Sequence, residues 1–260
     1  MKGSFLFLGS GASTGIPVIG CNCSACISSS SKNKRLRPAG LIKVAGKNLL
    51  VDVGPDFRQQ ALTYNITKLD GLLLTHVHFD HIAGIDELRV YYFHSKKPLP
   101  CLLSAESLDE LKLRYHYLFL PIGEVPTISA QLEFQMLEEE ASTVEFQGVN
   151  FEYCSYFQGH MKVTGFRLGN FAYISDIREY EETVFDSLKN VDYLIVSALR
   201  ESMSPVHFNI EEAIAFSKKV GAKKTWFTHI SHNLEHEEIE KKLPKGVHLG
   251  YDGLEIEFDY

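Results

Sequence analysis

The sequence has no apolar segment long enough to span a membrane. No stretch of its 260 residues approaches the roughly 18 consecutive apolar residues that a spanning helix needs. The first apolar run, residues 5–8, is too short for the hydrophobic region of a secretory signal, and the glycine-rich loop 9–15 ends it. We therefore expect a cytoplasmic protein with no membrane partner.

The sequence also lacks an excess of positive charge. Its formal net charge of −7 argues against a nucleic-acid polymer as partner, because proteins that bind one usually present a basic patch. It has no internal repeat, low-complexity tract or linker. Hydrophobic residues make up 45% of the chain, which suffices for a sizeable core. We expect a single domain over residues 1–260.

Short strand-like segments dominate both halves of the sequence, and each half closes with a strand–helix–strand pattern. Hairpins are predicted at 41–53 and 166–174, and a strand at 143–154. Helices are predicted at 55–64, 82–94, 104–120 and 210–220. This order is typical of an α/β fold in which two sheets pack together and helices cover them.

The densest group of metal-binding side chains is a His-x-His-x-Asp-His motif that directly follows a buried apolar strand. Histidine and carboxylate donors suit Zn, Mn or Fe. His76 and His78 are two residues apart on an extended segment and point the same way. Asp80 and His81 begin the next helix and can face a second ion. A solvated loop is the alternative, but four ionisable residues at a strand end favour a site.

Three further candidate ligands, His160, Asp176 and His229, each follow a predicted strand or loop. Each alone is more often a structural or surface residue. Together with the first motif they favour a two-metal site, because sheet-based folds build sites from the ends of several strands. Asp52 ends another buried strand, where a carboxylate can orient a ligating histidine from behind.

The chain has five cysteines, and three of them, Cys21, Cys23 and Cys26, lie within six residues. In a cytosolic chain disulfides are unexpected, and three thiols this close cannot all pair with good geometry. They can hold three corners of a zinc tetrahedron. His232, three residues after His229, is the expected fourth ligand. Free buried thiols are the alternative, since Cys-x-Cys-x-x-Cys is less diagnostic than paired Cys-x-x-Cys units.

These motifs resemble, in order and over nearly the whole chain, the ligand motifs of the metallo-β-lactamase superfamily. The resemblance implies a four-layer αββα sandwich and two divalent ions, Mn or Zn. The implied ligands are His76, His78 and His160 for one ion and Asp80, His81 and His229 for the other, with Asp176 bridging them. Two such ions activate a bridging water as hydroxide and clamp the group that it attacks.

Spacing separates the branches of this superfamily. Flavodiiron proteins have glutamate at the position of His78, and secreted β-lactamases need a signal peptide. Glyoxalase-type thioesterases carry a helical C-terminal domain, whereas 31 residues follow His229 here. Long-form RNA processors insert a whole domain before the last histidine. The tRNA-maturing enzymes extrude a long arm between the positions of His160 and Asp176, which here are 16 residues apart.

The cysteine loop, His232 and the segment Pro205-Val206-His207-Phe208 closely resemble the PhnP family of phosphoribosyl cyclic phosphodiesterases. The implied reaction is hydrolysis of a small cyclic phosphate of the phosphoribosyl 1,2-cyclic phosphate type by hydroxide held between the metals. Asp80 and His207 are the implied catalytic residues, with His207 protonating the departing sugar oxygen. An ordinary histidine before a helix is the alternative for His207.

The same resemblance implies a small phosphorylated substrate, a structural zinc in the cysteine loop and a homodimer. A phosphate at the far end of the substrate needs cations, for which Arg58, Arg178 and Arg200 are candidates. A broader hydrolase of cyclic nucleotides or small phosphodiesters needs only the same metal core. A non-hydrolytic role, as in PqqB-like proteins that share a similar cysteine loop, is disfavoured by the full ligand set.

Overall fold

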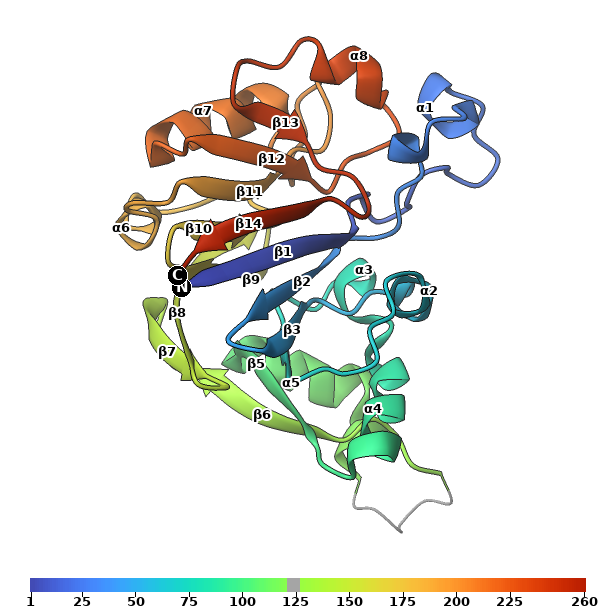
Figure 1. The fold of residues 1–260 in the computed structure, drawn as a ribbon, viewed down its shortest axis with the longest axis vertical. Helices are drawn as coiled ribbons and strands as arrows, with labels where there is room; N and C mark the ends of the chain where they lie inside the picture. Colours follow the sequence, from blue (N-terminus) through green and yellow to red (C-terminus); the bar gives the residue numbers. More distant parts are fainter. Residues whose placement is uncertain (121–126) are drawn as a thin grey trace.

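The computed structural model describes residues 1–120 and 127–260, and within them the chain forms two sheets of seven strands each (Figure 1). The first sheet has the strand order β14 (Glu255–Asp259), β1 (Lys2–Gly9), β2 (Ala39–Val44), β3 (Lys47–Val51), β4 (Gly71–Leu73), β5 (Leu99–Ser104) and β6 (Leu132–Leu137). The second has the order β13 (Val247–Leu249), β12 (Lys224–Thr228), β11 (Tyr193–Ser197), β10 (Phe171–Ile174), β9 (Met161–Leu168), β8 (Val149–Gln158) and β7 (Ala141–Phe146).

Short helices cover the outer faces of both sheets. In chain order they are α1 (Ser24–Ile27), α2 (Phe57–Thr63), α3 (Phe79–Ile82), α4 (Arg89–Ser95), α5 (Ala105–Arg114), α6 (Val184–Ser187), α7 (Ile210–Val220) and α8 (His236–Glu240). Three 3₁₀ turns, Ser31–Asn33, Ile85–Leu88 and His116–Phe119, accompany them in the described residues. No helix in the described parts of the chain is both long and apolar enough to cross a bilayer.

Apolar side chains fill the spaces between these layers. Between the sheets, Phe5 of β1 packs on Phe171 and Tyr173 of β10, with ring centroids 5.3 and 5.5 Å apart. A second cluster joins the outer face of the first sheet to α2, α4 and α5, and a third joins the second sheet to α6, α7 and α8. The predicted four-layer αββα sandwich is thereby confirmed.

The helix predicted at 82–94 is wrong as a single element. The chain forms α3, then the 3₁₀ turn Ile85–Leu88, and only then α4. Gly84 lies at the break, and a Cβ atom added there would come within 2.2 Å of the Gly54 carbonyl oxygen. The backbone of this loop therefore packs directly on the loop after β3. This contact, rather than helical periodicity, sets the path of the chain behind the His-x-His-x-Asp-His motif.

Two other predicted elements are shorter than expected. The helix predicted at 104–120 ends at Arg114, where α5 gives way to a 3₁₀ turn. The strand predicted at 143–154 is instead the hairpin β7–β8, which turns at Gln147 and Gly148 with φ values of 54° and 77°. Positive φ at two successive residues suits a tight hairpin turn. The hairpin turn lies away from the metal-binding motif, whereas Arg114 at the end of α5 donates a 2.8 Å hydrogen bond to the carbonyl oxygen of Val77 within it.

The two ends of the chain pair with each other. β1 and β14 are antiparallel neighbours, and the N-terminal amine of Met1 donates a hydrogen bond to the carbonyl oxygen of Tyr260 over 2.7 Å. The N and C labels therefore lie side by side in Figure 1. At the other end of β1, Gly11 pairs with Ile230, next to the predicted ligand His229.

Candidate active site

The His-x-His-x-Asp-His motif occupies the loop after β4 and the short helix α3. His76 and His81 are fully buried, and Asp80 is 5% exposed. The Nε2 atom of His76 lies 2.9 Å from Nδ1 of His78. Such close approach of ring nitrogens, one of them buried, is typical of histidines that share a metal ion.

Asp52 supports this motif from behind. Its Oδ2 atom lies 2.7 Å from Nδ1 of His81, and its Oδ1 atom accepts a hydrogen bond from the backbone N–H of Thr75 over 2.8 Å. The Thr75 hydroxyl also contacts Nδ1 of His76 at 2.9 Å. Both histidines therefore have one nitrogen fixed by a neighbour while Nε2 faces the cluster, which is the arrangement expected around metal ligands.

Asp176 lies at the centre of the cluster. Its Oδ1 atom is 3.5 Å from Nε2 of His81, and its Oδ2 atom is 3.7 Å from Nε2 of His76 and 3.4 Å from Nε2 of His229. His229 also approaches Asp80, with 3.1 Å between Nε2 and Oδ2. One carboxylate thus faces both halves of the ligand set, which fits the predicted bridge.

Three residues of this site have left-handed backbone conformations. Asp52, Asp176 and His229 each follow a strand, with φ values of 61°, 56° and 57°. Such a conformation costs a residue other than glycine about 1–3 kcal/mol and persists only where the surroundings enforce it. The turn at each strand end aims the side chain into the site instead of along the sheet.

Three overlapping groups of donor atoms, each within 4.8 Å of one another, lie in this part of the described chain: His76, His78 and Asp176; Asp80, His81 and His229; and Asp176, His207 and His229. The first two share no residue, so together they could hold two divalent ions. The Nε2 atom of His81 is buried and has no hydrogen-bond partner among the described residues. A buried nitrogen without a partner is costly unless a ligand satisfies it. The residues therefore fit two divalent ions.

The electrostatics of the site also favour a bound cation. Burial opposes a proton on His81, but Asp176, Asp52 and Asp80 outweigh burial and raise its pKa well above the usual value. Burial likewise opposes ionisation of Asp176, but His229 and His81 lower its pKa well below the usual value. Converging carboxylates stabilise positive charge at this point, whether a proton or a metal ion supplies it.

His160 does not join the cluster. It is exposed in the turn between β8 and β9, whereas the donor groups of the site are formed by other residues of the described chain. Gln158, the last residue of β8, takes the inward position and is 7% exposed. Its Nε2 atom lies 3.2 Å from Oδ2 of Asp176. His160 thus lies outside the donor groups of the described residues, because β8 ends at Gln158 and the following turn carries His160 outward.

His207 lies beside the cluster on the loop before α7. Its ring centroid is 4.6 Å from that of His229, and its Nδ1 atom is 3.9 Å from Oδ2 of Asp176. Gln158 contacts its Nε2 atom at 2.8 Å. Burial, followed by the charge of His229, lowers the pKa of His207 to about 4. The structure thus places His207 beside the candidate metal ligands, and its catalytic role stays a prediction.

The cysteine loop forms a second donor group with His232. The Sγ atoms of Cys21 and Cys23 lie 3.2 and 3.5 Å from Nδ1 of His232, and Cys26 completes the group. Ligand bonds of about 2.0–2.3 Å to a tetrahedral zinc place donors about 3.5 Å apart. Burial opposes ionisation of Cys23, but hydrogen bonds from the Cys26 backbone and His232 lower its thiol pKa to about 6. The three sulfur atoms and the imidazole thus lie close enough to one another to hold one ion.

The candidate phosphate-binding arginines are engaged elsewhere. Arg178 forms a 2.7 Å ion pair with Glu212. Arg58 lines a hollow of about 320 Å³ that includes none of the candidate metal ligands. Arg200 donates a hydrogen bond over 3.0 Å to the carbonyl oxygen of Met203, on the loop that carries His207. Of the three, Arg200 is the one tied to a segment of the site.

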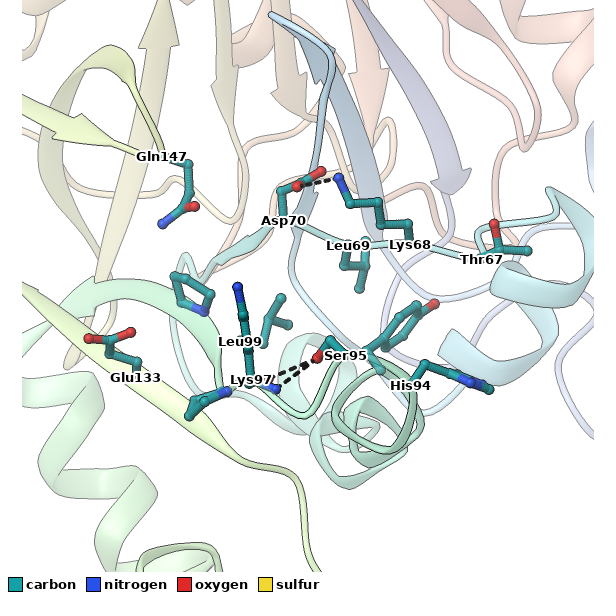
Figure 2. A pocket seen from close by; sticks show the side chains of 13 residues that line it. Thr67, Lys68, Leu69, Asp70, His94, Ser95, Lys97, Leu99, Glu133 and Gln147 are labelled. Atoms are coloured by element: carbon teal, nitrogen blue, oxygen red, sulfur yellow. Dashed lines mark hydrogen bonds and ion pairs between the residues drawn. The ribbon is translucent and has the colours of Figure 1, made fainter.

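A larger hollow lies at the amino ends of strands β4 and β5, at the opposite end of these strands from the candidate active site. It measures about 790 Å³ and is lined by residues that precede β4 and β5, among them Lys68, Asp70 and Lys97 (Figure 2). Lys68 and Asp70 form a 2.8 Å ion pair in it. Parallel strands carry their functional residues beyond the carboxyl ends, and here the metal ligands follow the carboxyl end of β4. The hollow is therefore separate from the candidate active site.

Residues 47–230 match the beta-lactamase superfamily domain, and the chain belongs to this superfamily and has the metallo-β-lactamase fold. It is 36% identical to a solved structure described as a new diphosphatase from the PhnP family, with a TM-score of 0.91 over 99% of this chain and 98% of that one. Zinc-bound PqqB from Methylobacterium extorquens shares the fold at 19% identity and a TM-score of 0.76, covering 97% and 99% of the two chains.

A relative in Porphyromonas gingivalis (strain ATCC BAA-308 / W83), named octanoyltransferase, is 34% identical over 264 residues, or 98% of this chain and 51% of the relative. The chain spans about half the length of that relative and a smaller share of the other curated relatives that it matches. Divalent-metal binding follows from the superfamily, and the donor groups described above are where this chain can provide it.

Proposed function

We propose that this chain is a metal-dependent phosphodiesterase that hydrolyses a small cyclic phosphate ester of ribose, of the phosphoribosyl 1,2-cyclic phosphate type. The observation that carries the proposal is the convergence of two donor groups on Asp176, with His207 against the same carboxylate. The likeness to a PhnP-family diphosphatase supports attack at phosphorus over attack at carbon. A cytoplasmic location and a homodimer stay predictions.

The residues of the chain divide the work. When bound, two divalent ions would supply an activated water and neutralise charge on the phosphate. His76, His78 and Asp176 would hold one ion, Asp80, His81 and His229 would hold the other, and Asp52 fixes the orientation of His81. His207 is placed beside the departing sugar oxygen, and because its pKa is lowered to about 4 it would first have to take up a proton, which a nearby phosphate anion favours, before it could donate that proton.

A diphosphate ester of a nucleoside is the second candidate substrate. The similar structure at 36% identity is described as a diphosphatase, which supports cleavage between two phosphorus atoms. Apolar side chains next to site residues favour a substrate with a base: Phe79 follows His78 and is 63% exposed, and Val206 precedes His207 and is 40% exposed. An aromatic ring at such a position can stack on a nucleobase.

A substrate panel tests the proposal. The manganese-loaded and zinc-loaded proteins would be assayed on a five-membered cyclic ribose phosphate, a 2′,3′-cyclic nucleotide, bis(p-nitrophenyl) phosphate and a dinucleoside diphosphate. The proposal predicts the highest kcat/KM on the cyclic ribose phosphate. Preference for the diphosphate would select the second candidate, and absence of turnover on all four with either metal would reject both.

We also propose that Cys21, Cys23, Cys26 and His232 hold a structural zinc. The converging sulfur and nitrogen atoms support this assignment. His232 is three residues from His229, so a zinc would tie the N-terminal loop to the loop that carries a catalytic ligand. Elemental analysis of the purified protein, before and after mutation of the cysteines, tests it.

A further inference from the structure

Gln158 has one end of its amide engaged in the candidate active site and the other end free. Its Nε2 atom lies 3.2 Å from Oδ2 of Asp176 and 2.8 Å from Nε2 of His207. Its Oε1 atom is buried and has no hydrogen-bond partner among the described residues. A buried carbonyl oxygen without a partner is destabilising, so this atom calls for a ligand that the described residues do not provide.

The position of Gln158 matches the first donor group. The Oδ2 atom of Asp176 that Gln158 contacts lies between both groups, 3.7 Å from Nε2 of His76 and 3.4 Å from Nε2 of His229, so the number of donors in each group decides which ion Gln158 serves. That group has two histidines and the shared carboxylate, and the expected third histidine, His160, is exposed in the following turn. Gln158, at the end of β8, is thus the polar side chain available to complete the group of His76, His78 and Asp176.

We infer that Gln158, through Oε1, is a ligand of the ion bound by His76, His78 and Asp176, while its amide N–H groups position His207. The inference rests on the proposed two-metal site and concerns which residues build it. The other ion has two histidines and two carboxylates, counting Asp176. The two sites are therefore unequal: a neutral amide oxygen replaces a stronger donor in one of them.

This inequality has a measurable consequence for metal preference. Amide and carboxylate oxygens suit Mn²⁺ and Mg²⁺, whereas imidazole suits Zn²⁺. The site with Gln158 should bind its ion more weakly than its neighbour, because a neutral amide replaces a carboxylate, and it should favour zinc less than the same site with histidine at position 158 would. Replacement of Gln158 by histidine should raise its affinity for zinc, and replacement by alanine should lower its affinity for every divalent ion.

Metal titrations without substrate test the inference. The protein with its cysteine site filled would be titrated with Mn²⁺ alone and Zn²⁺ alone by calorimetry, with elemental analysis after gel filtration. Loss of an outer partner of a ligand already costs roughly 10–100-fold in metal affinity, so Gln158→Ala should weaken the second equivalent at least as much. Gln158→His should tighten zinc at this site, and His160→Ala, the matched control from the adjacent turn, should leave both equivalents unchanged.

Each outcome decides. Loss of the second equivalent in His160→Ala, or its retention in Gln158→Ala, overturns the inference. If Gln158→Ala does not fold, as seen by circular dichroism, Gln158→Glu keeps an oxygen donor and must retain both equivalents for the inference to stand. No substrate is used in these titrations, so they test the metal ligands independently of the substrate assay. If the protein has no phosphodiesterase activity, the titrations can still show that Gln158 is a ligand. If Gln158 is not a ligand, the substrate assay still tests the proposed activity.

Discussion

The active-site ligands and the cysteine site of this protein are built in opposite ways. The active-site group gathers its donors mainly from the ends of β4, β10 and β12, which belong to both sheets, while β3 and β8 end in Asp52 and Gln158, which contact these donors. The cysteine group takes three donors from one six-residue loop and adds a single distant residue, His232. The first depends on the whole sandwich for its geometry, whereas the second depends mainly on local sequence. Mutations in the active-site group should therefore reduce catalysis, whereas mutations in the cysteine group should chiefly reduce stability.

The largest effect is expected for Asp176→Ala. Asp176 faces both halves of the active-site group, so its loss should cost several kcal/mol of transition-state stabilisation, about 10³-fold in kcat/KM. Steady-state kinetics on the best substrate, with metal content measured in parallel, check this. Asp186→Ala removes an exposed carboxylate from α6 and should leave activity unchanged. Equal losses in the two variants would contradict the central role of Asp176.

His207→Ala should have a smaller effect on activity and none on metal content. General acid–base groups contribute roughly 10²–10⁴-fold, and we expect a loss near the lower end of this range in kcat. Two active-site equivalents should remain, because the ligand sets assigned to the ions do not include His207. His94→Ala, an exposed histidine on α4, is the matched control. Loss of a metal equivalent in His207→Ala would make His207 a ligand instead.

Cys23→Ser should act chiefly on stability. Removal of one ligand should release the zinc and lower the free energy of unfolding by more than about 3 kcal/mol, beyond the range of ordinary substitutions. The activity of the remaining folded protein should fall less than about tenfold, because the active-site ligands stay in place. Elemental analysis and thermal melting check this. Cys154→Ala, a buried cysteine of β8 outside the donor group, should keep its zinc.

The smallest effect concerns the pH dependence of stability next to the cysteine loop. Burial, then Arg35 and Lys32, lowers the pKa of His236 to about 4 against opposing Glu240 and Glu235. Because the folded state prefers neutral His236, its contribution is complete above pH 6.5 and is lost as pH falls toward 4.

We therefore expect His236→Gln to melt with a shallower pH dependence between pH 6.5 and 4, by about 1–3 kcal/mol over that range. The exposed His116→Gln should follow the unmutated protein. If the stability of His236→Gln and of the unmutated protein falls equally between pH 6.5 and 4, a group other than His236 causes the loss of stability in acid.

The sequence was most informative where ligands lie close together along the chain. The His-x-His-x-Asp-His motif and the cysteine loop both form donor groups as predicted, and the αββα order was correct. The sequence predicts His160 as the ligand at the end of β8, whereas strand alternation sends Gln158 inward and the turn sends His160 outward. Side-chain direction at a strand end depends on where the strand stops.

The break at Gly84 was missed for a related reason. Apolar periodicity in residues 82–94 is compatible with one helix, and the close approach of Gly84 to the Gly54 backbone comes from a contact between distant segments. Likewise, the left-handed conformations of Asp52, Asp176 and His229 leave no local signature, because none of these residues is a glycine. Tertiary contacts set each of these features.

The pairing of the two chain ends on β1 and β14 has a practical consequence. Met1 and Tyr260 are hydrogen-bonded at one end of the first sheet, while the ligands lie beyond the other end of β1, about 25 Å away along an eight-residue strand. A short peptide could join the two ends, and new ends could be opened in an exposed turn such as Gln147-Gly148. A circularly permuted protein of this kind should keep its metal centre intact.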